Sequence, residues 1–524
     1  MSFTSVTYFL FVGISLLIYT IVPKRAKWCV LLGASAVYYV MAAGLRTLWL
    51  VAAILIVYGG GLLLGYLNDQ GKARRKAAAD KEEKKQIRKK YDAKKRAVVT
   101  VAVLGVFGLL IALKYVNFLG ESAYGIAGLF GSQSAYQPVQ ILLPLGISYY
   151  TLCAVSYVVD VYRGKYKPER NFFKLALFLS FFPQMTEGPI GKYEIMMPRL
   201  VEGHSFDFER DAQAVMRIFW GMFKKMVIAD RANLFVTGVF DNGDQAGSMV
   251  LLGTLLYTVQ IYCEFSGCMD IVCATGQLLQ ENFRRPIFSK TINEFWQRWH
   301  ITLGAWIKEY VFFSVSLSKG LMNLSKHTRK KLNDYFANLV PMTFALFCVW
   351  FFNGIWHGAS WKYVLYGLYY YILMMIGMYL RPVSDKLLHA LHIAPESKGF
   401  ALFQMVRTFL IVNVGMMLFR CHTISQWGQS LARIFTDFDG ACLTNGTVLS
   451  LGNDWQDFLI MGIGVLVVGI VEVLQEKGHT IRSELARRPV VLRYAVFLAL
   501  ILGVIVFGAY GTGYETVAPI YGQF

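Results

Sequence analysis

The chain contains 524 residues, of which 56% are hydrophobic and only 16% are charged, and its mean hydropathy is +0.45. A soluble chain is typically about 25% charged. The composition therefore excludes a soluble protein and predicts an all-α polytopic membrane protein, with residues 1–524 forming one large transmembrane domain.

The first predicted helices set the orientation of the chain. The apolar segment 4–22 precedes its first cation, Lys24, which indicates an uncleaved helix rather than a signal peptide. Two spans follow, at 28–43 and 47–68, and then a stretch at 72–96 with 13 Lys/Arg and 4 Asp/Glu. A nucleic-acid patch is one interpretation of this stretch, but its place between apolar spans favours a cytoplasmic loop, with anionic lipid as an additional contact. The basic residues at 23–27 and 72–96 are separated by two crossings, and both lie on the cytoplasmic side only if the N-terminus is outside.

Continuing this alternation predicts 12 crossings, with an error of about one or two, and both termini outside the cell membrane. The segment 171–189 is short and broken by Pro183 and Pro189, which predicts a re-entrant piece that lines a cavity. The segment 280–335 is too polar to span twice, and we expect it on the cytoplasmic side, dipping into the bilayer. The remaining predicted crossings are 97–113, 136–159, 212–240, 249–275, 338–361, 363–380, 405–419, 458–471 and 494–514.

His357 lies between Trp356 and Gly358 in the apolar window 338–361, which contains no Asp, Glu, Lys or Arg. An ionisable side chain at membrane depth indicates a functional site, because hydrocarbon solvates it poorly. The alternative is an interfacial histidine beside an aromatic belt. Asn353 lies one helical turn earlier and is a candidate to orient the His357 ring.

His300 is the second candidate. If the segment 289–310 is one helix, Trp296, His300, Gly304 and Ile307 share a face and Arg298 lies elsewhere. The alternatives are an interfacial anchor helix and a structural histidine that makes a hydrogen bond.

Other polar residues in apolar surroundings are candidate supporting residues, although buried charges need partners whatever the function. Asn282 and the neighbouring arginines are candidates to cap a helix or clamp an anionic ligand, or are only an inside-positive signal. The eight cysteines lie mostly in apolar runs without metal-site spacing and are expected to pack as small apolar residues, so no metal site is predicted. The supporting candidates are Asn353, Trp356, Trp296, Trp299, Arg298, Asn282, Glu187, Glu264, Asp270 and Ser266.

Two motifs carry a family resemblance: NFRRPIFSKTINEFWQRWHITLGAWIKEY at 282–310 and FFNGIWHGASWKYVLYGLYY at 351–370. They resemble the membrane-bound O-acyltransferase (MBOAT) family, in its bacterial alginate O-acetyltransferase-like branch. Further matching stretches lie at 144–164, 178–200, 261–272 and in the C-terminal IYGQF. This chain departs from the branch at 306–310 and in the length and charge of the segment 72–96.

The resemblance implies an MBOAT fold with a central tunnel, about 11–12 transmembrane helices and added re-entrant or interfacial helices. It implies acyl transfer to a hydroxyl, with the catalytic histidine at His357 and the second family histidine at His300. The expected donor is a cytoplasmic thioester, acetyl-CoA or an acyl carrier protein, used as a substrate with no bound cofactor. The expected acceptor is an extracytoplasmic cell-envelope or secreted polysaccharide, or a partner acetyltransferase that completes the transfer.

Two alternatives remain open from the sequence. One is transfer of D-alanine from a carrier protein to teichoic acid. The other is a transporter that moves an acyl donor or polymer without catalysis, which would also use intramembrane carboxylates and a broken segment.

Overall fold

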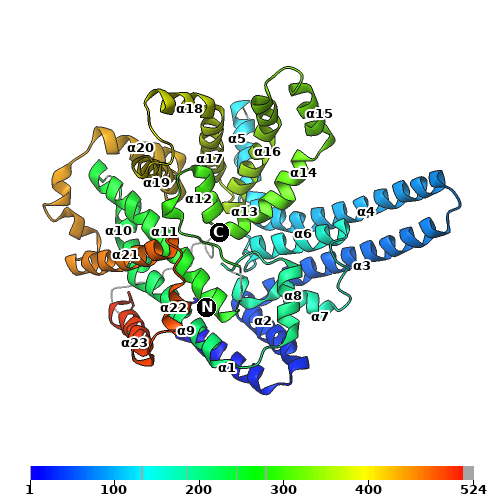
Figure 1. Cartoon of the computed structure of the whole chain (residues 1–524), viewed down its shortest axis with the longest axis horizontal. Helices are drawn as coiled ribbons and strands as arrows, with labels where there is room; N and C mark the ends of the chain where they lie inside the picture. The colour runs from blue at the N-terminus through cyan, green and yellow to red at the C-terminus, as the bar shows by residue number, and fades with distance from the viewer. Residues whose placement is uncertain (1, 132–133, 186, 244, 278–279, 511–524) are drawn as a thin grey trace. The chain divides into compact units, whose positions relative to one another are not determined.

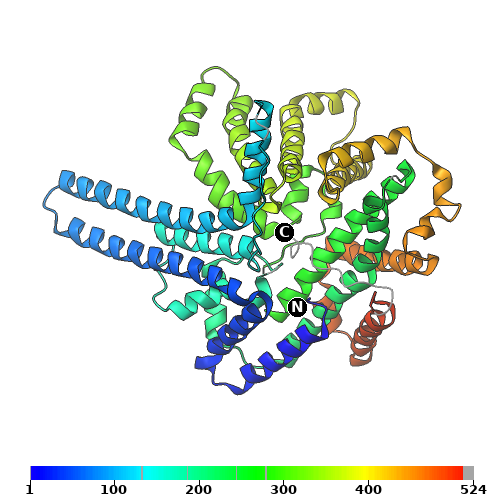
Figure 2. The same cartoon turned by 180° about the vertical axis from the view of Figure 1, so that it is seen from behind.

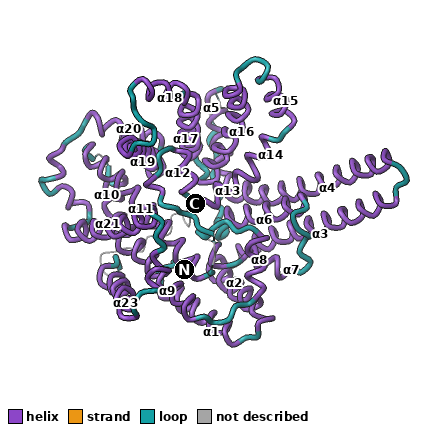
Figure 3. Tube along the Cα trace, viewed as in Figure 1, coloured by secondary structure: helices purple, strands orange, loops and turns teal. Residues whose placement is uncertain are grey.

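The described part of the chain is helical almost throughout (Figure 1, Figure 2). The computed structural model describes residues 2–131, 134–185, 187–243, 245–277 and 280–510. The trace of these residues consists of helices and loops, with no strand (Figure 3). Their β pairing is limited to an isolated bridge between Phe283 and Trp299. The all-α prediction is confirmed. The C-terminal IYGQF lies outside the described residues.

The chain divides into two compact units, the first at 3–207 and the second from residue 208 onward. The assignment of a single domain stays a prediction. The first unit contains α1 (Val6–Ile21), α2 (Lys27–Ala43), α3 (Thr47–Ala77), α4 (Lys81–Leu110), α5 (Val116–Leu129), α6 (Ile147–Arg163), α7 (Phe172–Ser180) and α8 (Tyr193–Glu202).

Helices α3 and α4 form a long antiparallel hairpin that packs on α6 (Figure 1). Its apolar segment 47–68 is about 33 Å long, which matches the roughly 30 Å hydrocarbon core of a bilayer. The basic stretch 72–96 is therefore not a loop, as the sequence suggested, but the helical tip of this hairpin. Asp80 caps α4 by accepting from Glu83 N, and Gly71 lets the Tyr91 ring approach α3 closely.

The second unit surrounds α11, whose residues are mostly buried and which packs against α9, α10, α19 and α20. Its helices are α9 (Phe208–Met222), α10 (Asp230–Asp241), α11 (Gly247–Thr275), α12 (Ile292–Arg298), α13 (Ile301–Ile307), α14 (Phe313–Ser316), α15 (Lys319–Thr328), α16 (Asp334–His357), α17 (Trp361–Tyr379), α18 (Arg381–Ala390), α19 (Lys398–Arg420), α20 (Ile424–Thr436), α21 (Trp455–Glu476), α22 (Ile481–Ala486) and α23 (Val490–Phe507).

Each of the 12 expected crossings coincides at least in part with helical structure, but fewer stretches are both long and apolar enough to span a membrane. Seven described stretches meet that standard, or eight if the bent pair α17 and α18 is one span. Helices α1 and α6 have 16 and 17 residues and are short for a crossing. The expected span 212–240 carries Lys224, Lys225 and Asp230 where a π-helical turn, 223–229, joins α9 to α10. In the segment 171–189, α7 ends at Ser180 and a short turn follows at 182–184, so the predicted break is present, and the re-entrant path and the cavity stay predictions.

Candidate active site

His357 is the last residue of α16, and a close helix contact fixes its position. A Cβ on Gly354 would lie 2.4 Å from Tyr363 O, and a Cβ on Gly367 would lie 2.2 Å from Trp350 O. Only glycine permits these approaches of α16 and α17. The His357 side chain is consequently enclosed, and the residue is only 3% exposed.

Aromatic rings from three helices surround the His357 imidazole. The ring centroids of Trp356, Phe419 and Tyr366 lie 5.1, 5.4 and 5.6 Å from it. Lys362 at the start of α17 donates to the carbonyls of Phe419 (3.3 Å) and Cys421 (2.8 Å), which satisfies the end of α19 and holds Phe419 over the histidine. These rings and the close contact of α16 with α17 enclose the imidazole.

His300 does not lie within a continuous helix, so the prediction of one helix over 289–310 is wrong. Helix α12 ends at Arg298, Trp299 is extended, and His300 has a left-handed backbone with φ 48° and ψ 51° before α13 begins. The reason is a tertiary contact. Arg284 N donates to Arg298 O, and the bridge between Phe283 and Trp299 draws the chain out of the helix. Trp296 and His300 therefore do not share a helix face.

Asn282 holds this turn in place. Its backbone carbonyl accepts from Ile301 N at 3.0 Å, and its Oδ1 accepts from Thr302 N at 2.9 Å and Thr302 Oγ1 at 2.6 Å. Its Nδ2 donates to Met269 Sδ at 3.1 Å. Asn282 thus caps α13 from a distant part of the chain and fixes the residue that precedes it, His300.

We expect Asn282→Ala to lower the free energy of unfolding by about 1–3 kcal/mol, because it leaves the buried Thr302 N–H without an acceptor. It should also lower acyl transfer by about 10- to 100-fold, because the His300 turn loses its support. The measurement is thermal unfolding in detergent together with kcat and KM at a temperature where the variant is folded.

The matched control is Asn453→Ala, which removes an equally buried asparagine whose Nδ2 donates to Arg231 O. We expect a similar loss of stability with little loss of activity. Equal activity of the two folded variants would contradict a positioning role for Asn282.

The two histidines meet through one indole. The Trp356 ring lies 5.1 Å from His357 and 5.6 Å from His300, and the His300 ring also contacts Phe265 at 4.9 Å. Residues 57 positions apart in the chain therefore flank the same ring. The structure brings together the two histidines that the sequence singled out.

The other candidate tryptophans line the same part of the second unit. Trp296 packs against Trp350 at 5.1 Å and Tyr370 at 4.9 Å, and its buried Nε1 donates to no described residue. Trp299 stacks on Phe295 at 5.5 Å and belongs to the same hydrophobic core. Both rings pack in or against the hydrophobic core that also contains Tyr366 and Phe419, the neighbours of His357.

The candidate carboxylates on α11 belong to buried ion pairs. Glu264 accepts from Lys225 Nζ at 3.2 Å, and Asp270 binds Arg217 Nε at 2.7 Å and Lys224 Nζ at 2.7 Å. Ser266 accepts from Lys224 Nζ at 3.0 Å. These contacts fit a structural role for the three residues as partners of buried cations. A direct role in catalysis stays a prediction.

The cationic partners of these carboxylates were not predicted as site residues. The available signal was the set of cations in the predicted span 212–240, namely Arg217 and the adjacent Lys224 and Lys225. A buried lysine needs a carboxylate, so the pair could have been matched to the acidic positions of α11.

Three further candidates remain predictions. Asn353 is buried in α16, and its Oδ1 accepts no hydrogen bond within the described part of the chain. Glu187 is buried in the first unit. Arg298 lies on the surface of the second unit, where it binds Glu294 and Glu476.

Burial lowers the pKa of His300 to about 3. His300 is therefore uncharged at neutral pH and has one N–H to donate. A group with this pKa is a weak base, because a general base works best when its pKa is near the operating pH. The folded-state pKa lies below that of the unfolded chain, so His300 lowers stability as the pH falls from about 6.5 to 3.

The fold defines a multi-span membrane protein whose second unit holds two buried histidines around one tryptophan. The model of the MBOAT, membrane-bound O-acyltransferase family, matches residues 169–328. A probable alginate O-acetylase AlgI of Azotobacter vinelandii is 30% identical over 438 residues, which are 83% of this chain and 77% of the relative. The chain belongs to the membrane-bound O-acyltransferase family and is an acyltransferase.

Two other relatives differ in the acceptor that their names state. The peptidoglycan O-acetyltransferase of Helicobacter pylori is 29% identical over 316 residues, which are 54% of this chain and 56% of the relative. The teichoic acid D-alanyltransferase of Bacillus subtilis is 25% identical over 305 residues, which are 55% of this chain and 71% of the relative. Relatives of this chain thus differ in the acyl group and in the acceptor.

Proposed function

We propose that this acyltransferase passes an acetyl group from a cytoplasmic thioester to a hydroxyl of an extracytoplasmic polysaccharide, or to a partner protein that completes the transfer. The observation that carries the proposal is the pair of buried histidines on either side of Trp356. Similarity over 83% of the chain to a probable alginate O-acetylase supports acetyl as the acyl group.

The two histidines divide the work in this mechanism. A thioester is already activated, so the enzyme has to deprotonate the attacking hydroxyl and align it with the acyl carbon. Neutral His357 takes the hydroxyl proton as the oxygen bonds to the carbonyl carbon, and the thiolate then leaves and is protonated. His300, with its pKa held low by burial, donates its N–H to the carbonyl oxygen as negative charge develops there.

Acyl transfer by detergent-solubilised, purified protein tests the proposal. The donors are radiolabelled acetyl-CoA and D-alanine carried on a D-alanyl carrier protein, and the acceptors are a polysaccharide, peptidoglycan fragments and teichoic acid. We expect labelled ester to form from the acetyl donor. Transfer from the D-alanyl donor alone would show a D-alanyltransferase and not an acetyltransferase. Uptake of a substrate into vesicles that contain the protein, without ester formation, would identify a transporter.

A further inference from the structure

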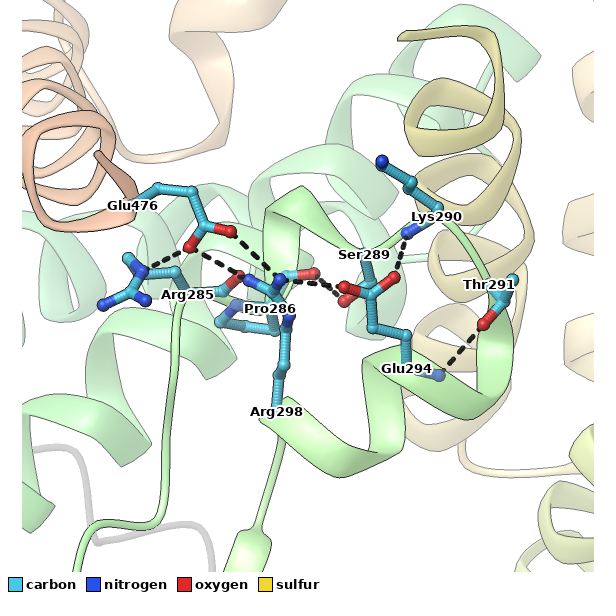
Figure 4. A network of polar contacts seen from close by, with 8 residues as sticks. All are labelled: Arg285, Pro286, Ser289, Lys290, Thr291, Glu294, Arg298 and Glu476. Carbon is cyan, nitrogen blue, oxygen red and sulfur yellow. Dashed lines mark hydrogen bonds and ion pairs between the residues drawn. The ribbon is translucent and has the colours of Figure 1, made fainter. Parts of the chain in front are cut away.

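Two arginines that precede His300 in the chain, Arg285 and Arg298, bind the carboxylate of Glu476 (Figure 4). Arg298 binds Glu476 through both terminal nitrogens, with Nη2 to Oε1 at 3.0 Å and Nη1 to Oε2 at 3.1 Å. Arg285 Nε donates to the same Oε2 at 2.5 Å. The carboxylate at the end of α21 thus occupies a fork made by two guanidinium groups.

This fork carries unused binding capacity. Within the described residues, Nη1 and Nη2 of Arg285 donate no hydrogen bond, and neither Arg284 nor Lys290 has an ion-pair partner. The side chains of Arg285, Arg298 and Glu476 are 24%, 19% and 29% exposed, so solvent and solutes reach them. We call Arg285 and Arg298 with Glu294 and Glu476 the arginine clamp; Arg284 and Lys290 are further cations of the same segment.

The backbone supports a binding role for the clamp. Arg285 has a left-handed conformation with φ 48° and ψ 63°. Strained non-glycine residues of this kind concentrate at ligand sites. Glu476 is the last residue of α21, where the helix dipole disfavours a carboxylate. The two arginines therefore stabilise the Glu476 carboxylate at a position that the helix itself disfavours. An anion with better geometry can therefore replace it.

The clamp lies beside the candidate active site. Arg298 is two residues before His300, and two residues extend at most about 7 Å. Both segments that form the clamp, 280–335 and 476–488, are expected on the cytoplasmic side from their positive charge. A cytoplasmic donor would meet the clamp before its acyl group reached the histidines.

We propose that Arg285 and Arg298 bind the phosphate of a phosphopantetheine thioester, and that Glu476 occupies this site when no donor is bound. The inference rests on the proposed function for the thioester donor. A guanidinium fork matches the oxygens of phosphate as well as those of a carboxylate. Coenzyme A and a carrier protein both present this phosphate on a flexible arm, and the acyl thioester is at the far end of that arm.

The test compares donors with and without phosphate. Full-length protein in phosphatidylcholine nanodiscs receives acetyl-CoA, S-acetyl-4′-phosphopantetheine or S-acetyl-pantetheine, and each KM is measured for wild type, Arg285→Gln and Arg298→Gln. We expect the arginine variants to raise KM about 10- to 100-fold for both phosphate-bearing donors and to leave KM for S-acetyl-pantetheine nearly unchanged. Glu476→Gln should lower KM for the phosphate-bearing donors, because the competing carboxylate is gone. The control is Arg381→Gln, an exposed arginine on α18 whose loss should change no KM.

The outcomes separate this inference from the proposed function. An equal rise of KM for all three donors would make the clamp purely structural and overturn the inference. An arginine effect that appears only after phosphatidylglycerol is added would assign the site to a lipid headgroup and also overturn it. Wild type that transfers from none of the thioesters would overturn the proposed function itself.

A direct binding measurement on more conservative variants covers the case in which the glutamine variants of the arginines fold poorly. Calorimetric titration with coenzyme A, and with pantetheine as the phosphate-free probe, is repeated on Arg285→Lys and Glu476→Gln. We expect Glu476→Gln to bind coenzyme A more tightly and pantetheine unchanged. Unaltered affinity of both variants for coenzyme A would overturn the inference, whatever the activity data show.

Discussion

Replacing His357 with alanine should lower the rate of acyl transfer by about 10²- to 10⁴-fold, which is the usual contribution of a positioned general base. The reason is that the His357 imidazole, enclosed by Trp356, Tyr366 and Phe419, is the group proposed to accept the hydroxyl proton. The measurement is ester formation by purified protein, with kcat and KM determined separately and the amount of folded protein checked by size-exclusion chromatography. The loss should fall mainly on kcat, because the proton transfer belongs to the chemical step.

Two variants control for packing at this position. His357→Gln keeps much of the buried volume and should be as inactive as His357→Ala, since glutamine cannot accept the proton. His389→Ala removes an exposed histidine of α18 and should leave the rate unchanged. Normal transfer by His357→Gln would exclude His357 as the base.

The second large effect is expected on stability. Lys225→Met should lower the free energy of unfolding by about 3–5 kcal/mol, because it removes the cation that the carboxylates of Glu264 and Asp230 share. Lys225 Nζ lies 3.2 Å from Glu264 Oε1 and 2.5 Å from Asp230 Oδ1. The side chains of Lys225 and Glu264 are 2% and 1% exposed, so water cannot replace the lost contact.

The measurement is the midpoint of thermal unfolding in detergent together with the yield of folded protein from membranes. Lys386→Met provides a matched control, because Lys386 is exposed on α18 and the substitution should change stability by no more than about 0.5 kcal/mol. The double variant Lys225→Met with Glu264→Gln should recover part of the loss, because it removes both buried charges. A single variant as stable as wild type would show that Glu264 is neutral or finds another partner.

Because these carboxylates belong to buried ion pairs, their presence in a membrane span does not by itself indicate a transporter or a catalytic carboxylate. Glu264 and Asp270 each have a cationic partner from the π-helical turn between α9 and α10 or from α9 itself. A π-helical turn shifts the register of the side chains that follow it, and such turns are frequent at functional sites. Here it brings Lys224 to Asp270 and Ser266, and Lys225 to Glu264, on different sides of α11.

The sequence alone determined the class of the protein and its most informative residues. Apolar windows of membrane-crossing length and the positive charge between them do not depend on tertiary contacts, so the helical membrane architecture and the positions of most helices followed directly. His357 and His300 could be singled out because an ionisable group in apolar surroundings is costly and therefore conspicuous.

Only the tertiary structure decided how these residues meet. The break at His300 depends on Asn282 and on the bridge from Phe283 to Trp299, which local helix preference cannot reveal. The contact of both histidines with Trp356 likewise depends on how separate helices pack. The ion pairs of Arg285 and Arg298 with Glu476 join positions nearly 200 residues apart. Such contacts arise from long-range packing, for which the periodicity of a single segment carries no signal.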